Sequence, residues 1–274
     1  MEKYTKEYYL NTNKLPTMWC PGCGSGIVLG SIVRALERLQ INKEDVVIAT
    51  GIGCWGKGDD YFKTNGFHGT HGRCLSFATG IKAGNPNLKV IALMGDGDGS
   101  TIGGNHLIHT ARRNFDITAI IVNNLNYGMT GGQYSATTPH GKKTITSKLG
   151  NPERPFDLCE LVKAAGANYV ARGDVYHVNQ LDNLIYEAIS KKGFSMVEAI
   201  SVCPTHFGKL NKMGEAPEML KTIGAACVNQ KQYDLLSDED KEGKYIVGVI
   251  ANRDNPDFIS VYDSIRNENF KEDK

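Results

Sequence analysis

Residues 89–99 read KVIALMGDGDG, an apolar run that ends in an acidic, glycine-rich turn. Six residues of the run, 89–94, are almost all apolar, which is typical of a strand buried on both faces of a parallel sheet. Ligands of open α/β sheets bind beyond the carboxyl ends of the strands. The turn at Asp96 is therefore a candidate binding site.

Similar apolar runs recur along the chain and alternate with stretches of helical periodicity. Strands are predicted at 45–50, 89–94, 117–123, 168–171 and 194–200, and helices at 25–39, 104–114, 156–165 and 178–191. This alternation predicts an α/β fold over about residues 20–201: an open, mostly parallel sheet flanked by helices. We divide the chain into a domain of residues 1–203 and an extension of residues 204–274, packed on the domain or on a partner.

Two segments interrupt the alternation, and the extension is mixed. Residues 51–75 and 125–155 are long and rich in glycine or polar residues, and loops of this length in a compact domain are usually functional. Within the extension, 215–228 has a helical pattern, 237–244 is charged and 245–251 resembles a strand.

The composition is that of an ordinary soluble domain. Lysine and arginine number 31 and aspartate and glutamate 30, a net charge of +1, so we expect no nucleic-acid partner. No apolar run approaches the roughly 18–20 residues that cross a bilayer. Residues 1–10 are polar and lack a signal-peptide core, so we expect no membrane association and a cytoplasmic location.

Seven cysteines in such a chain favour metal or redox chemistry over disulfides. Cys20 and Cys23 form a Cys-x-x-Cys pair just before a predicted helix. A thioredoxin-like pair would need a preceding strand, and a zinc site would need further ligands, such as His68 and His71. Cys54 and Cys203 each follow a predicted strand at the same sheet edge, so a four-cysteine iron–sulfur cluster is a third hypothesis. Plain buried cysteines are the fourth.

The turn at Asp96 has several interpretations. A calcium loop fails, because its sixth position is Thr101 and its twelfth is Leu107. A magnesium–diphosphate site fits better, because the next strand ends in Asn123-Asn124 and Mg²⁺ accepts carboxylate and amide oxygens. Residues 51–56 read GIGCWG, but no helix or acidic residue follows as a dinucleotide site requires.

Together these motifs resemble a known family. Gly95-Asp96-Gly97, followed after twenty-five residues by Asn123-Asn124, closely matches the thiamine diphosphate signature. With the motifs CPGC (20–23), GIGC (51–54), HGR (71–73), GGNH (103–106) and YGMTGGQ (127–133), the chain resembles the β subunit of a 2-oxoacid:ferredoxin oxidoreductase. The resemblance covers about residues 15–210. A non-redox thiamine enzyme half and a zinc-stapled binding module are the alternatives.

The resemblance implies a role for each matching residue. Mg²⁺ would be held by Asp96, Asn124 and the backbone carbonyl of Asn126, and one [4Fe–4S] cluster by Cys20, Cys23, Cys54 and Cys203. Contacts to the diphosphate and thiazolium groups of thiamine diphosphate would come from Ile52, Gly53, Cys54, Trp55, His71, Gly72, Arg73, Cys74, Gly97, Asp98, Gly128 and Met129.

The resemblance also implies a reaction and partners. The expected reaction is coenzyme A-dependent oxidative decarboxylation of 2-oxoglutarate to succinyl-CoA and CO₂, with electrons passing through the cluster to ferredoxin. Pyruvate or a broad range of 2-oxoacids is the alternative substrate. Lys57 could pair with the distal carboxylate of 2-oxoglutarate. The family's activating glutamate lies on an α subunit, so this chain would act only with that partner, as an (αβ)₂ assembly.

Overall fold

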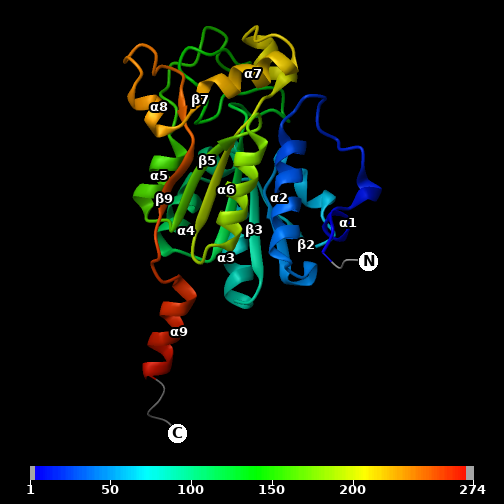
Figure 1. Ribbon diagram of the computed structural model, residues 1–274, viewed down its shortest axis with the longest axis vertical. Helices are drawn as coiled ribbons and strands as arrows, with labels where there is room; N and C mark the ends of the chain where they lie inside the picture. Colours follow the sequence, from blue (N-terminus) through cyan, green and yellow to red (C-terminus); the bar gives the residue numbers. More distant parts are fainter. Residues whose placement is uncertain (1–3, 270–274) are drawn as a thin grey trace.

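A computed structural model describes residues 4–269, and its centre is a seven-stranded sheet with the order β2-β1-β3-β4-β6-β5-β9 (Figure 1). Six strands run parallel, and only β9 pairs antiparallel, with β5. The strands are β1 (Val46–Thr50), β2 (Asn65–His68), β3 (Lys89–Gly95), β4 (Ile117–Asn123), β5 (Tyr169–Asp174), β6 (Ser195–Ile200) and β9 (Gly248–Asn252). The predicted open, mostly parallel α/β fold is confirmed.

Helices cover both faces of the sheet, which explains why its central strands are almost entirely buried. One core lies between the sheet and helices α2 (Ser25–Leu39) and α6 (Val178–Ser190). A second core lies on the opposite face, against α3 (Cys74–Gly84), α4 (Gly104–Arg113) and α5 (Leu158–Ala165). Every residue of β1 and β4 is buried, as expected for strands covered on both sides.

The predicted strands and helices up to residue 228 are confirmed to within a few residues at their ends. The single strand expected at 245–251 is wrong, because the segment forms two strands, residues 245–246 and 248–252, in different sheets. The loop at 51–75 contains more structure than expected. It holds a short 3-10 helix (Trp55–Tyr61), the edge strand β2 and the first residues of α3. The helix after β1 is a short 3-10 helix, whereas a dinucleotide motif would open an α-helix there. A four-residue helix, α1 (Lys6–Tyr9), packs near α2.

The C-terminal extension both completes the main sheet and builds a cap over its carboxyl edge (Figure 1). The cap contains α7 (Ala216–Ala226), α8 (Gln230–Asp234) and a two-stranded sheet of β7 (Cys227–Val228) and β8 (Tyr245–Ile246). The chain then returns as β9 along β5 and ends in α9 (Phe258–Asn269), where Phe258 stacks on Phe115.

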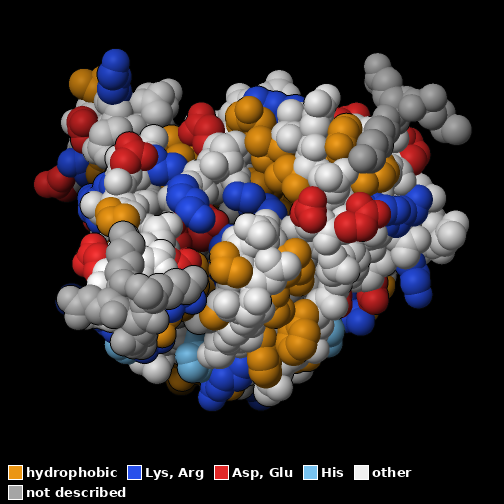
Figure 2. All heavy atoms as spheres, turned by 90° about the horizontal axis from the view of Figure 1, so that it is seen from below, with side chains coloured by type: hydrophobic (Ala, Val, Ile, Leu, Met, Phe, Trp, Pro, Cys, Tyr) orange, Lys and Arg blue, Asp and Glu red, His pale blue; other side chains and the backbone are white. Residues whose placement is uncertain are grey.

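Charged groups of both signs are interspersed with hydrophobic side chains on the face seen from below (Figure 2). This distribution matches the near-zero net charge of the sequence. Among residues 4–269, no helix has both the length and the apolar character to cross a bilayer.

Candidate functional site

Asp96 is the first residue after β3, and its carboxylate is almost completely buried, at 1% exposure. Its Oδ2 accepts hydrogen bonds from the hydroxyl groups of Ser135 and of Thr137, the latter at 2.8 Å. Burial raises the pKa of Asp96 to about 6, although these hydroxyl groups oppose the shift. A cation bound nearby would stabilise the charged form of Asp96, so this carboxylate is a candidate cation ligand.

Asp96 Oδ1 faces the turn that follows β4. The nearer terminal atom of the Asn124 amide lies 3.1 Å from Asp96 Oδ1 and 2.8 Å from the backbone oxygen of Asn126. If this atom is the amide nitrogen, it donates hydrogen bonds to both oxygens. If the amide group is rotated by 180°, the amide oxygen of Asn124 occupies the same position. Three oxygen atoms then converge, an arrangement that a divalent cation stabilises and that fits the preference of Mg²⁺ for oxygen.

A small cavity of about 160 Å³ opens beside this triad and is lined by the glycine turns after β1, β3 and β4. Asn126 is 2% exposed, and its Nδ2 has no hydrogen-bond partner among the described residues. A buried donor without a partner is costly unless a ligand supplies an acceptor. Phosphate oxygens would do so, and the glycine turns leave the backbone accessible to them.

Asp98 anchors the opposite wall of the cavity. Its Oδ1 accepts hydrogen bonds from the backbone amides of Gly72 at 2.6 Å and Ile52 at 3.3 Å. His71 Nδ1 lies 2.7 Å from the same oxygen but makes no hydrogen bond there, and Asp98 Oδ2 also has no partner among residues 4–269. Burial raises the pKa of Asp98 above its usual value. Asp98 thus joins the loops after β1 and β3.

The four cysteines predicted to bind a cluster lie near one another. Burial raises the pKa of the Cys54 thiol to about 12, and the nearby thiols of Cys23, Cys203 and Cys20 raise it further. Gly128 adjoins two of them: a Cβ there would lie 3.6 Å from both Cys54 Sγ and Cys203 Sγ. A bound metal deprotonates its cysteine ligands outright, so neutral thiols are compatible with this site.

The two histidines considered as zinc ligands lie against carboxylates. His68 contacts Asp59, and His71 contacts Asp98. Within the described chain, no three His, Cys, Asp or Glu side chains form a group that could hold a single metal ion. The zinc and cluster hypotheses for the cysteines therefore both stay predictions.

Most predicted cofactor contacts line the cavity, and a few do not. The lining includes Ile52, Gly53, Cys54, Trp55, His71, Asp96, Gly97, Asp98, Asn124, Asn126, Gly128 and Met129. The backbone amide of Gly72 donates a hydrogen bond to Asp98. The Arg73 side chain donates to the backbone oxygens of Gly72 and Ile102. Cys74 donates from its buried thiol to the backbone oxygen of Ala49. Lys57 lies outside this lining and pairs with Asp60 at 2.9 Å.

The structure adds site residues that sequence reasoning missed. Ser135 and Thr137 bind Asp96, although residues 125–155 were predicted only to be functional as a whole. Trp19, beside Cys20, donates from Nε1 to the backbone oxygen of Cys54 at 2.6 Å, which links the two cysteine segments. The polar composition of the long loop was the only signal for the hydroxyl groups, because no spacing rule relates position 96 to position 135.

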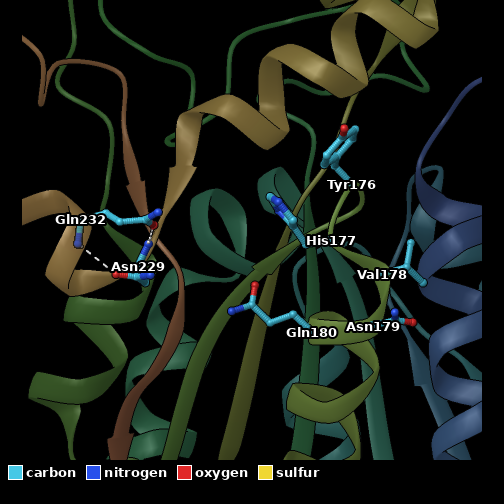
Figure 3. Close-up of a pocket in the computed structure, with 7 residues that line it drawn as sticks. All are labelled: Tyr176, His177, Val178, Asn179, Gln180, Asn229 and Gln232. Carbon is cyan, nitrogen blue, oxygen red and sulfur yellow. Dashed lines mark hydrogen bonds between the residues drawn. The ribbon is translucent and has the colours of Figure 1, made fainter.

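A second cavity, of about 630 Å³, lies where α6 and α8 begin (Figure 3). It is lined by Tyr176, His177, Val178, Asn179, Gln180, Asn229 and Gln232. His177 Nδ1 lies 2.9 Å from the buried Asp174, and Asn229 and Gln232 bond to each other. None of the predicted site residues lines this cavity, so the cavity beside Asp96 is the candidate site.

The fold and site have a known counterpart. Residues 48–199 match the family described as thiamine pyrophosphate enzyme, C-terminal TPP binding domain. This segment contains β1, β3 and β4 and the turns that surround the Asp96 cavity. The chain is therefore built on a thiamine pyrophosphate-binding domain, as the motifs predicted.

Individual relatives narrow the family. The chain is 47% identical over 259 residues to the 2-oxoglutarate synthase subunit KorB of Methanothermobacter thermautotrophicus, covering 94% of this chain and 91% of the relative. It is 52% identical over 198 residues to the same subunit of Archaeoglobus fulgidus, covering 72% of this chain and 74% of the relative. The chain belongs to the family of 2-oxoglutarate synthase KorB subunits, which confirms the predicted resemblance.

A solved structure supports this membership. The fold matches a chain of the 2-oxoglutarate:ferredoxin oxidoreductase from Magnetococcus marinus, solved with 2-oxoglutarate, coenzyme A and succinyl-CoA bound. The TM-score is 0.88 at 30% sequence identity, and the match covers 100% of this chain and 94% of the other. The cap and α9 are therefore within the matched length.

Proposed function

We propose that this chain is the β subunit of a 2-oxoglutarate:ferredoxin oxidoreductase. The reaction is the coenzyme A-dependent oxidative decarboxylation of 2-oxoglutarate to succinyl-CoA and CO₂, with electrons leaving to ferredoxin. The convergence of Asp96, Asn124 and Asn126 beside the cysteine group is the observation that carries the proposal. Family membership supports the choice of substrate, because the relatives are named for 2-oxoglutarate.

The residues around the cavity would hold thiamine diphosphate through Mg²⁺. Asp96, the side chain of Asn124 and the backbone carbonyl of Asn126 supply oxygen ligands, and Asn126 Nδ2 is free among the described residues to donate to a diphosphate oxygen. When bound, the thiazolium ring of the cofactor provides an electron sink for decarboxylation. Gly128 and Met129, which line the cavity, would contact the thiazolium side of the cofactor.

Cys20, Cys23, Cys54 and Cys203 would ligate one [4Fe–4S] cluster close to the ring. Cys54 lines the cofactor cavity and also belongs to the cysteine group, so it joins the two sites. Gly128 lies between the cavity and the sulfurs of Cys54 and Cys203, and its lack of a side chain keeps the separation short. Burial and hydrogen bonds to sulfur then tune the reduction potential.

The cavity in this chain is too small to enclose a whole cofactor. Small-molecule sites usually measure about 300–1,000 Å³, whereas this cavity measures about 160 Å³. Two of the side chains that line it, Ile52 and Met129, are hydrophobic and exposed. We infer that an α subunit covers this cavity, supplies the pyrimidine side of the site and assembles with this chain as (αβ)₂, and that the complex passes electrons to ferredoxin.

An anaerobic assay tests the proposed reaction. The chain is purified with its co-produced partner, and coenzyme A-dependent viologen reduction is measured with 2-oxoglutarate and with pyruvate. A strong preference for 2-oxoglutarate supports the proposal. Preference for pyruvate would keep the reaction class but replace the substrate, and reduction without coenzyme A would contradict the stated reaction.

Two variants separate the cofactor site from the cluster. Asp96→Ala is expected to abolish Mg²⁺-dependent thiamine diphosphate binding and to leave the cluster absorbance and about four irons per chain. Cys203→Ala is expected to give an oxygen-labile or three-iron cluster, while Mg²⁺-dependent cofactor binding persists. Retained cofactor affinity in the first variant, or an unchanged four-iron spectrum in the second, would remove the corresponding assignment.

A further inference from the structure

Asn123 ends β4, directly before the proposed metal ligand Asn124, and its side chain is 2% exposed. Its Oδ1 accepts a hydrogen bond at 3.1 Å from the backbone amide of Leu125, two residues ahead. This bond closes an Asx turn, in which an asparagine side chain replaces a backbone group. Leu125 has a φ of 67°, a left-handed conformation that a leucine adopts only under local constraint. The bond from Asn123 therefore stabilises the turn that presents the metal ligands.

Glu198, on the neighbouring strand β6, fixes which way the Asn123 amide points. Asn123 Nδ2 donates to Glu198 Oε1 at 2.7 Å, and both side chains are buried. The other oxygen, Glu198 Oε2, accepts from Arg172 Nε at 2.7 Å and from the Cys159 thiol at 3.4 Å. Because an ionised carboxylate only accepts hydrogen bonds, it holds the amide nitrogen of Asn123 toward itself. The amide oxygen is thereby left facing Leu125.

The turn is also held from its other side. Thr138 donates from Oγ1 to the backbone oxygen of Leu125 at 2.6 Å. Thr138 belongs to the same loop as Ser135 and Thr137, whose hydroxyl groups bind Asp96. The Asn124–Asn126 turn is therefore clamped between Glu198 on the sheet side and the 135–138 segment on the Asp96 side.

We propose that Glu198 and Asn123 are positioning residues for the metal site: the carboxylate sets the direction of the Asn123 hydrogen bonds, and these hold Asn124 and Asn126 in the ligating turn. This inference rests on the proposed function only for the identity of the ligand, since the hydrogen-bond chain is a property of the protein itself. Partners that orient metal ligands typically change metal affinity about 10–100-fold when they are altered.

The hydrogen bond between Asn123 and Glu198 can be tested by exchanging the amide and the carboxylate between the two positions. In Glu198→Gln, one oxygen must serve two donors, from Arg172 and Asn123, so the Asn123 bond is lost. In Asn123→Asp, a carboxylate faces the carboxylate of Glu198. In the double variant, the new amide at position 198 accepts from Arg172 and donates to the new carboxylate at position 123, whose second oxygen still accepts from Leu125. The double variant therefore has the same net charge and the same number of hydrogen bonds as the wild-type chain, with the carboxylate and the amide exchanged between the two positions.

Two readouts are measured on the complex with its partner. The first is hydrogen exchange of the segment containing the Leu125 amide in cofactor-free protein; the second is the Mg²⁺ concentration that half-saturates thiamine diphosphate binding. Each single variant is expected to speed the exchange and to raise the Mg²⁺ requirement about 10–100-fold. The double variant is expected to recover most of both effects.

Asp157→Asn is the matched control. It also converts a carboxylate partner of Arg172 to an amide, since Asp157 Oδ1 lies 2.6 Å from Arg172, but it leaves the Glu198–Asn123 bond in place. Equal effects in this control and in Glu198→Gln would overturn the inference, as would a double variant no better than the singles. If Glu198→Gln does not fold, Asn123→Asp breaks the same bond from the other side.

The experiment also separates this inference from the proposed function. Asp96→Ala, measured alongside, is expected to remove the Mg²⁺-dependent binding of thiamine diphosphate and to change exchange at Leu125 less than Glu198→Gln does, because the Asn123–Leu125 bond stays in place. If Asp96→Ala leaves the Mg²⁺ dependence intact, the metal assignment fails. If exchange at Leu125 is unchanged in both Glu198→Gln and Asn123→Asp, the positioning chain fails whatever the ligand is.

Discussion

At the scale of single residues, Gly97 and Tyr127 determine the shape of the cofactor cavity. The Tyr127 hydroxyl donates to the backbone oxygen of Gly97 at 3.1 Å, and its ring packs directly over the glycine. A Cβ on Gly97 would lie 2.2 Å from Cε1 of that ring, a distance that requires one of them to move. The glycine is therefore needed for close packing of the β3 and β4 turns.

Gly97→Ala is expected to displace Tyr127 and weaken thiamine diphosphate binding. Overpacking of this kind costs about 1–3 kcal/mol, which we expect in both the free energy of unfolding and the cofactor affinity. Gly104→Ala is the control, because no atom lies within 4 Å of its added Cβ. Calorimetric titration of the cofactor and denaturant unfolding check this, and similar affinities in the two variants would contradict the packing argument.

Lys57 is a second residue with a testable role. Its ammonium pairs with Asp60 at 2.9 Å, and both side chains are about one-third or more exposed. Such a pair contributes less than about 1 kcal/mol, so a substrate carboxylate could replace Asp60 as the partner.

Lys57→Ala is expected to raise KM for 2-oxoglutarate about tenfold, or about 1.4 kcal/mol, the scale of one hydrogen bond to a charged group. The KM for pyruvate, which lacks the distal carboxylate, is expected to change little. Asp60→Asn serves as the control and should not raise either KM. Steady-state kinetics with both substrates measure these KM values. Equal increases in KM for 2-oxoglutarate and pyruvate would show that Lys57 does not select the substrate.

At the scale of secondary-structure elements, a buried ion pair joins α3 to the start of β4. Lys82 on α3 contacts Asp116 Oδ2 at 2.7 Å, and both side chains are less than 10% exposed. Burial alone would raise the pKa of Asp116, but the bond from Lys82 and the charges of Lys89 and Lys82 bring it below its usual value. Asp116 therefore stabilises the fold in its charged form.

The pKa of Asp116 sets the pH range of this contribution. Because the folded pKa lies below the unfolded one, the contribution is complete above about pH 4 and is lost as the pH falls through the folded pKa. Asp116→Asn leaves Lys82 buried without its partner, which is expected to cost about 3–5 kcal/mol of unfolding free energy at pH 7.

Urea unfolding of the two proteins from pH 7 downward checks this expectation. The difference in unfolding free energy should narrow below about pH 4. Asp254→Asn is the control: its carboxylate pairs with Lys191 but is 94% exposed, so a loss below about 1 kcal/mol is expected. If the difference in unfolding free energy between wild type and Asp116→Asn does not depend on pH, the charge of Asp116 is not the cause of the stabilisation.

The elements also show what sequence patterns could predict. Strands β1, β3 and β4 were predictable because burial on both faces makes them nearly continuous apolar runs. Strands β5 and β6 were predictable from their apolar parts, although they contain the buried charged residues Arg172, Asp174 and Glu198. Edge strand β2 escaped prediction because all four of its residues are exposed and carry no apolar pattern. Helix α3 was missed because its first residues adjoin a glycine-rich loop. The bonds of Ser135 and Thr137 to Asp96 depend on how a long loop folds back, which no local pattern encodes.

At the scale of the whole molecule, the proposed cofactor site is only partly formed by this chain. A cavity of about 160 Å³ with exposed hydrophobic residues in its lining requires a second surface to close it. The chain without its partner is therefore expected to bind thiamine diphosphate at least about tenfold more weakly, or by about 1.4 kcal/mol, than the complex does.

Titration of thiamine diphosphate in the presence of Mg²⁺, with the chain alone and with the complex, measures this difference. Thermal unfolding and circular dichroism of the lone chain confirm that it is folded during the titration. Equal affinities would show that this chain holds the cofactor without help.

The order of the strands has a consequence for synthesis in the cell. Cys20 and Cys23 precede β1, whereas Cys203 follows β6, which pairs with β4 in the middle of the sheet. Ribosomes add about 5–20 residues per second, so the fourth thiol emerges about 10–40 s after the first pair. During that interval the nascent chain contains Cys20, Cys23 and Cys54 but has neither Cys203 nor strand β6. Assembly of the proposed iron–sulfur cluster on this chain is therefore expected to be a late event that follows translation of most of the protein.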